Sequence, residues 1–118
     1  MKLVSPLLKI TNQLRIFHWQ SETYAEHKAY GKAYEEFSDL VDDFVEIFMG
    51  KNGKVKAKLT YNIELDNYGE HNLTYVNDFI SYLTGIDKEL TPADTDLLNI
   101  RDEMLGILNR LKYLLSLK

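Results

Sequence analysis

The sequence contains no cysteine. Without thiols the chain has no disulfide framework, no cysteine-ligated zinc or iron–sulfur site, and no thiol nucleophile. An excess of one charge is also absent, because 14 basic and 18 acidic residues leave a formal net charge of only −4. The chain therefore lacks the positive field that attracts nucleic acid, and we expect no nucleic-acid partner. The absence of disulfides fits a reducing compartment.

Long hydrophobic runs are missing as well. The N-terminal residues have no apolar run of signal-peptide length, and no stretch approaches the roughly 18 apolar residues of a membrane span. The composition is 45% hydrophobic, 12% aromatic and 27% charged, which is typical of globular rather than disordered chains. Chains of this length usually build one core. We therefore expect one cytoplasmic, soluble domain over residues 1–118, without a membrane partner.

Helical spacing of apolar residues is clearest in the first half of the chain. Steps of four and three residues from Leu3 to Phe17 predict a helix that ends near Gln20. The same spacing continues over about residues 22–49 and predicts a second, unusually long helix. Gly50 is predicted to end that helix, because glycine commonly follows the last helical turn.

Two further helices are predicted in the second half. A weaker apolar pattern indicates one over about residues 70–84, with Gly85 near its end. The last helix is predicted to begin at Thr91 and Pro92, because threonine is a good N-cap and proline fits the first helical position. The chain is thus predicted to be all-α with four helices.

The segment between the second and third helices has a different period. After the turn signal Asn52-Gly53, apolar and polar residues alternate from Val55 to Leu65, which is typical of an extended chain. Twelve extended residues reach about 40 Å, roughly the length of the second helix. The segment can therefore return the chain along that helix, which is the long crossover of one subclass of four-helix bundles. The alternative is a disordered basic loop.

The C-terminal half of the second helix carries six acidic residues and no basic residue between Ala33 and Gly50. Like charges four residues apart destabilise a helix, so this arrangement needs an explanation. Most of these acids are interpreted as a solvated face. Two share a row one turn apart, and that spacing suits the chelation of a hard cation by carboxylate oxygens. The six are Glu35, Glu36, Asp39, Asp42, Asp43 and Glu46, and the paired two are Asp42 and Glu46.

Two histidines flank the predicted turn between the first and second helices. His18 ends one helix and His27 lies near the start of the next, so an antiparallel pair brings them to a similar level. A lone histidine at such a position is usually packed or solvated. Together with Asp42 and Glu46, the two histidines form a candidate set of metal ligands.

These four residues cannot meet within one chain. His27 and Asp42 are fifteen residues apart on one helix, a rise of roughly 22 Å. A two-fold axis near Tyr34 and Glu35 lays two such helices antiparallel, so that His27 of one subunit meets Asp42 of the other. The site is then made twice in an isologous dimer. The Glu-x-x-His pair of intrachain diiron bundles is absent from the sequence.

These residues resemble the Dps-like mini-ferritins of the ferritin-like superfamily, of which this chain is a short and divergent example. The resemblance covers about residues 14–49. It is strongest in the spacing from the second histidine to the aspartate and the glutamate. The residues that carry it are His18, Trp19, His27, Tyr34, Phe37, Asp42 and Glu46.

The resemblance implies a metal site between two subunits, with His18 and His27 from one and Asp42 and Glu46 from the other. It implies Fe(II) binding and oxidation (ferroxidase activity) at a mononuclear or dinuclear site, commonly with hydrogen peroxide. It also implies iron storage or peroxide detoxification in a homo-oligomer, at least a dimer and up to a hollow dodecamer. The chain departs from the family pattern at Gly31, where a carboxylate is usual, and in a turn about three residues shorter.

Two alternatives remain. The chain is either a metal-free helical interaction module that keeps this fold, or a bundle that binds Zn or Mn structurally at the same residues, because ligand type alone does not distinguish neighbouring metals. Other features are interpreted as structural: His71, the packing of Trp19 beneath the turn, and a basic run that balances the acidic helix or solubilises a loop. The basic run is Lys51, Lys54, Lys56 and Lys58.

Overall fold

The structure is a computed structural model, and it describes residues 3–117. Regular structure in this range is entirely helical, which confirms the predicted all-α class with four helices. No described helix has both the length and the apolar character needed to cross a membrane. The elements are α1 (Val4–Gln20), α2 (Tyr24–Asn52), α3 (Asn72–Thr84), the short 3-10 helix η1 (Gly85–Glu89) and α4 (Thr95–Ser116).

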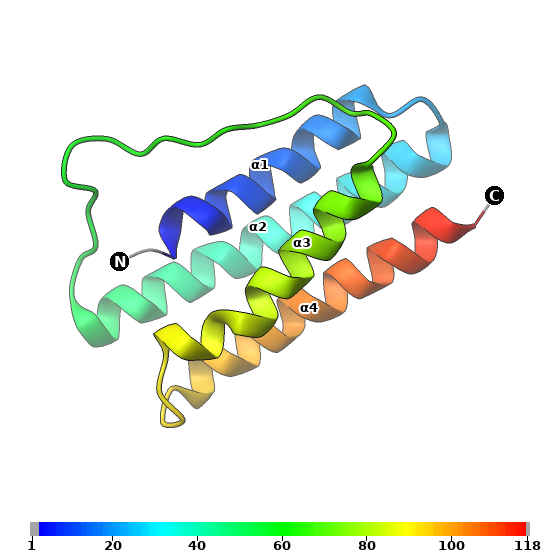
Figure 1. Cartoon of the computed structure of the whole chain (residues 1–118). Coiled ribbons are helices and arrows are strands. Elements are labelled where there is room, and N and C mark those ends of the chain that lie inside the picture. Colours follow the sequence, from blue (N-terminus) through cyan, green and yellow to red (C-terminus); the bar gives the residue numbers. More distant parts are fainter. Residues whose placement is uncertain (1–2, 118) are drawn as a thin grey trace.

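The four helices lie side by side along one direction (Figure 1). Helix α2 returns antiparallel to α1 after a short turn. Residues 53–71 then run back along the molecule without helix or strand, so that α3 begins at the end where α2 began and runs parallel to it. Helix α4 runs antiparallel to α3. The predicted path of the chain between the second and third helices is therefore the path that the structure has.

The end of the crossover segment is held to α1 by two glutamine side chains. The amide of the fully buried Gln13 donates to the backbone oxygen of Asp66 at 2.7 Å and accepts from its backbone nitrogen at 2.8 Å. Gln20 accepts a hydrogen bond from the backbone nitrogen of Tyr68 at 2.7 Å. These bonds satisfy backbone groups that an extended chain would otherwise leave unpaired, and they hold residues 66–68 against α1.

The end of α2 differs from the prediction. The helix continues through Gly50 and ends at Asn52. Gly53 follows with a φ of +85°, and its backbone nitrogen donates to Met49. A side chain at position 53 would be strained in this left-handed conformation, whereas glycine adopts it freely. The predicted stop at Gly50 was wrong because the turn residue Gly53 is the one that requires a positive φ.

The start of α4 also differs. The predicted N-cap Thr91 and first residue Pro92 form a turn before the helix, which begins at Thr95 with Asp94 at the N-cap position. The carboxylate of Asp94 accepts hydrogen bonds from the Thr91 backbone nitrogen at 2.8 Å and from its hydroxyl at 3.1 Å. Because these bonds close a local turn, the Thr-Pro signal marks the turn that precedes the helix.

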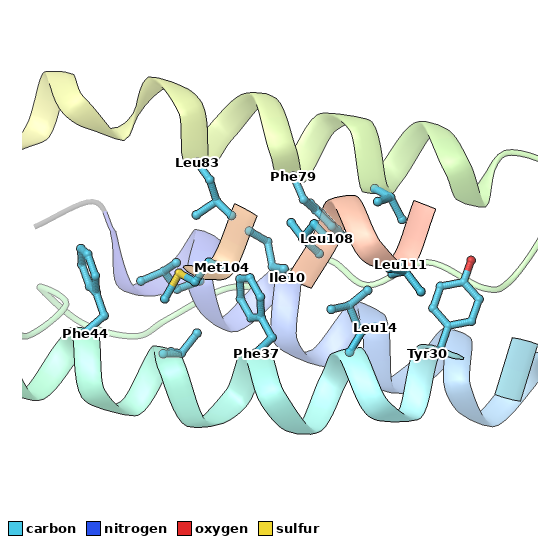
Figure 2. Packing of buried hydrophobic residues seen from close by; sticks show 14 of the residues in the cluster. Ile10, Leu14, Tyr30, Phe37, Phe44, Phe79, Leu83, Met104, Leu108 and Leu111 are labelled. Carbon is cyan, nitrogen blue, oxygen red and sulfur yellow. The ribbon is translucent and has the colours of Figure 1, made fainter. Parts of the chain in front are cut away.

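One hydrophobic core runs between the four helices (Figure 2). The predicted apolar stripes of α1 and α2 face it, and α3 and α4 close it from the other side. This arrangement leaves the outer surface of α1 and α2, where the candidate ligands lie, free of the core. Buried residues include Leu7, Ile10, Leu14 and Phe17 of α1, Tyr30, Phe37 and Phe44 of α2, Val76, Phe79 and Leu83 of α3, and Leu97, Met104, Leu108 and Leu111 of α4.

Candidate functional site

The turn between α1 and α2 places His18 and His27 face to face. Only residues 21–23 separate the two helices. The Ser21 hydroxyl donates to the backbone oxygen of His18 at 3.2 Å, and the Thr23 hydroxyl caps α2 by accepting from the Glu26 backbone nitrogen at 3.1 Å. A short turn capped on both sides brings the last turn of α1 level with the first turn of α2. The predicted proximity of the two histidines is therefore confirmed.

The two imidazoles make a reciprocal pair of hydrogen bonds. Nδ1 of His18 lies 2.7 Å from the backbone oxygen of His27, and Nδ1 of His27 lies 2.8 Å from the backbone oxygen of His18. The rings stack with their centroids 3.9 Å apart and their planes at 19°. Both side chains are half-buried. Each ring is thereby fixed in position and orientation by the backbone of the other helix.

These bonds define the tautomer of both rings. A backbone carbonyl only accepts hydrogen bonds, so each Nδ1 must carry the proton. In neutral histidine Nε2 then has a free lone pair. Metal-binding histidines typically donate their second ring N–H to a carbonyl or carboxylate, which orients the ring and raises its basicity. Both Nε2 atoms could therefore bind a metal ion when the rings are neutral.

The stacking limits how the pair can bind metal. A ligated ion lies in the plane of its imidazole, about 2.0–2.1 Å from the nitrogen in the case of zinc. With nearly parallel rings 3.9 Å apart, an ion in the plane of the His18 ring lies outside the plane of the His27 ring. The observed orientation therefore suits one ion per imidazole, and two-metal sites typically hold their ions about 3.5–4 Å apart.

Gly31 provides the space for this arrangement. A Cβ atom at position 31 would lie 2.7 Å from both Cε1 and Nδ1 of His18, closer than carbon atoms pack. The His18 ring therefore lies directly against the backbone of α2, one turn after His27. Any side chain at this position would collide with the ring, so the glycine here has a steric reason.

The two predicted carboxylate ligands lie away from the histidines. Asp42 and Glu46 are exposed on α2, one turn apart, and neither makes an ion pair with any residue in the range 3–117. Between His27 and Asp42 the helix rises by roughly 22 Å. Within residues 3–117 no three histidine, aspartate or glutamate side chains come close enough together to hold a metal ion. One chain therefore brings together half of the predicted ligand set.

An open depression surrounds the histidine pair, and its lining includes Gly31 and the exposed Glu35. Glu35 was predicted to belong to the solvated face, and it lies at the edge of this depression. Two lysines of α2, Lys28 and Lys32, complete the lining. The depression therefore combines two imidazoles and one carboxylate with two ammonium groups, whose positive charge opposes the entry of a cation.

A cluster that the sequence analysis missed lies beside the histidines. The Arg15 guanidinium lies 4.5 Å from the centroid of the Tyr34 ring and 5.9 Å from that of Trp19, and its Nη2 donates to the Tyr34 hydroxyl. Trp19 does not pack beneath the turn as predicted, because 67% of its surface is exposed. The sequence did contain a signal for this cluster, because Arg15 and Trp19 are four residues apart on one helix and are therefore neighbours on its surface.

Lys51, the first residue of the basic run, has a different role from the predicted one. Lys51 does not balance the acidic face of α2. Its ammonium group lies 2.7 Å from the carboxylate of Asp94 and 2.8 Å from that of Asp96, and it ties the end of α2 to the start of α4. Hydrogen bonds from Lys51 lower the pKa of both aspartates, and the same bonds raise the pKa of Lys51. His71 is exposed at the N-cap position of α3, consistent with a structural position.

Comparison with known proteins identifies relatives without an assigned activity. A family described as "Family of unknown function (DUF5856)" matches residues 18–115. The "Uncharacterized 14.6 kDa protein in mobD-ri intergenic region" of Enterobacteria phage T4 is 30% identical over 102 residues, which cover 86% of this chain and 75% of the phage protein. No solved structure matches the chain significantly. The residues matched by the family, 18–115, include both histidines and both carboxylates of the predicted site.

Proposed function

We propose a metal-centred function for this chain, which belongs to the DUF5856 family. It binds Fe(II) and oxidises it at a site shared by two subunits of a ferritin-like four-helix bundle, in the cytoplasm. The order of the helices and the long crossover between α2 and α3 support the ferritin-like assignment. The reciprocal pair of His18 and His27 is the observation that carries the proposed activity.

The pair suits iron as a substrate because of what its nitrogens offer. Imidazole is a good ligand for iron, and in the neutral form of each ring the proton that the hydrogen bonds require on Nδ1 leaves Nε2 with a free lone pair. Asp42 and Glu46 of the partner subunit supply carboxylate oxygens, which complete a nitrogen and oxygen ligand set with open positions. Two Fe(II) ions, one at each imidazole, each give one electron to hydrogen peroxide, which takes up two protons and leaves as water.

The shared site follows from the length of α2. A two-fold axis near Tyr34 and Glu35 makes the α2 helices of two subunits antiparallel and brings His27 level with Asp42 of the partner subunit. Each dimer then has two sites. Asp42 and Glu46 support this arrangement, since both are exposed on α2 and neither makes an ion pair among residues 3–117.

Subunit complementation tests both the ligands and their distribution. His27→Ala and Asp42→Ala should each abolish Fe(II) oxidation as pure proteins. When the two variants are refolded together, half of the dimers are mixed, and each mixed dimer has one site with both defects and one intact site. Roughly a quarter of the wild-type activity should therefore return, given an isologous interface. A shared site would be refuted if the activity of the mixture stayed at the level of the pure variants while native mass spectrometry confirmed that mixed dimers had formed.

Calorimetry after chelator treatment tests metal binding without relying on oxidation. Fe(II), Mn or Zn should raise the melting temperature by mass action. Asp42→Asn should abolish that gain, and it should raise the metal-free melting temperature because it removes repulsion from Glu46 one turn away. A wild-type protein whose melting temperature does not respond to any of the three metals would favour a metal-free interaction module. A response to Zn or Mn without Fe(II) oxidation would favour a structural metal site.

A further inference from the structure

Arg15 is a partly buried cation that has no carboxylate partner among residues 3–117. Its guanidinium lies between the Tyr34 and Trp19 rings, and its Nε is buried without a hydrogen-bond partner in the described part of the chain. A guanidinium has five N–H donors in a planar fork that suits a carboxylate. Partly buried charges without partners are costly, so the structure of a single chain leaves Arg15 incompletely satisfied.

The neighbouring face of α2 carries an excess of negative charge. Of its six acidic residues, only Glu36 makes an ion pair in the described range, with Lys32 at 3.9 Å. Because like charges facing each other across an interface are costly, two such faces cannot come together unless cations lie between them. Arg15 projects from α1 onto Tyr34, directly before Glu35 in this acidic helix, and is in the right place to supply that charge.

The surface around Arg15 has the composition of a protein interface. Trp19 is 67% exposed although it is a large aromatic residue. Arginine, tryptophan and tyrosine are the residue types most enriched among those that dominate binding energy at interfaces. We name Arg15, Trp19 and Tyr34 the arginine–aromatic patch. Its exposed member, Trp19, directly follows His18 on α1, and its half-buried member, Tyr34, also packs against the core.

We propose that the arginine–aromatic patch binds a second copy of this chain, with Arg15 of each subunit paired to Glu35 of the partner subunit. This inference rests on the proposed function for the position of the two-fold axis. With the axis between Tyr34 and Glu35, Glu35 of the partner subunit comes level with Tyr34, over which Arg15 lies. The same surface then supplies both the cation and the acid, so that two-fold symmetry makes both ion pairs at once.

Charge reversal of each member tests this pairing. In Arg15→Glu the substituted residue faces Glu35 of the partner subunit, and in Glu35→Arg the substituted residue faces Arg15 of the partner subunit. Each variant alone should dimerise at least tenfold more weakly than wild type by sedimentation velocity in the presence of chelator. An equimolar mixture should form a heterodimer with near wild-type affinity, because one of its two ion pairs then has the wild-type polarity and the other has the reversed polarity, and both are attractive. Pairing within one chain predicts no such rescue.

Two controls separate this effect from misfolding and from net charge. Lys88→Glu makes the same charge change in η1, where Lys88 is exposed, and it should leave dimerisation unchanged. Circular dichroism should show that both single variants remain folded. If either is unfolded, Arg15→Gln and Glu35→Gln replace them, and each should weaken the dimer severalfold. A monomeric wild type, or an Arg15→Glu variant that dimerises normally, would overturn the proposal.

The outcome is separable from that of the proposed function, since dimerisation is measured without metal. A specific heterodimer from the two charge-reversed variants, together with no thermal response of the wild type to metal, would keep the interface and reject iron binding. A wild type that binds metal as a dimer, with variants that dimerise normally, would keep the function and reject Arg15 as the interface residue.

Discussion

Replacement of Gly31 by alanine tests the packing that places His18 in the candidate site. Alanine is worth about 1 kcal/mol more than glycine in a helix interior, so the backbone alone favours the substitution. The new Cβ would lie 2.7 Å from two atoms of the His18 ring, which must therefore move. Moving it costs a hydrogen bond of about 1 kcal/mol and a ring stack of about 0.5–1.5 kcal/mol. We expect a net destabilisation of up to about 1.5 kcal/mol.

Gly106 is a matched control for this substitution. It also lies within a helix, and a Cβ there would meet nothing within 4 Å. Gly106→Ala should therefore gain the helix preference and stabilise the protein by about 1 kcal/mol. Chemical denaturation of the two variants in parallel should give free energies of unfolding that differ by about 1.5–2.5 kcal/mol. Gly31→Ala in a His18→Ala background should recover the gain, because the colliding ring is absent.

The same substitution should weaken metal binding more than it weakens the fold. Loss of the hydrogen bond that orients a ligating histidine typically costs 10–100-fold in metal affinity. Gly31→Ala should therefore bind metal at least tenfold more weakly while it remains folded at room temperature. A Gly31→Ala protein as stable as Gly106→Ala, with unchanged metal affinity, would refute the contact between His18 and α2 and the reasoning built on it.

Two further predictions concern stability away from the site. The ion pairs of Lys51 lower the pKa of Asp94 and raise the pKa of Lys51. Their contribution to stability is therefore fully present between the unfolded pKa values of roughly 4 and 10.4. It is lost as the pH falls through the folded pKa of the aspartates or rises through the folded pKa of the lysine. Lys51→Met should therefore destabilise the protein in urea titrations near neutral pH and converge with wild type at both extremes. Burial raises the pKa of Tyr82 to about 12, and its hydroxyl has no hydrogen-bond partner in the described chain. Tyr82→Phe should therefore raise the free energy of unfolding by about 1 kcal/mol. A loss of stability would show that the hydroxyl is satisfied.

Much of the fold could be predicted from periodicity. The apolar steps of four and three identify the faces that α1, α2 and α4 bury, because burial of those faces is what stabilises each helix. Helix ends were less predictable. Gly50 and Gly53 both carry a stop signal, and only the backbone conformation shows which one needs a positive φ. Thr91-Pro92 is a valid N-cap sequence, yet the side chain of Asp94 uses Thr91 to close a turn.

The sequence predicted which residues lie at the same height along the antiparallel helices, but it did not predict which side chains contact each other. Antiparallel helices with a short turn were enough to bring His18 and His27 together. The reciprocal bonds to backbone oxygens and the stacking of the rings depend on side-chain rotamers, which no spacing rule specifies. The position of Arg15 over Tyr34 joins residues nineteen apart on different helices, so a pattern along one helix cannot reveal it.

The short turn between α1 and α2 and the glycine at position 31 are physically related. Only residues 21–23 lie between α1 and α2, so the end of α1 is close to α2, and the His18 ring lies on the surface of that helix. The ring then occupies the space that a side chain at position 31 would need, and only glycine is compatible with it. In return, the backbone oxygen of His27 comes within 2.7 Å of the His18 Nδ1 and fixes its tautomer. Glycine at position 31 is therefore coupled to the orientation of two imidazoles, and under the proposed function the carboxylates that complete their ligand set come from Asp42 and Glu46 of the partner subunit.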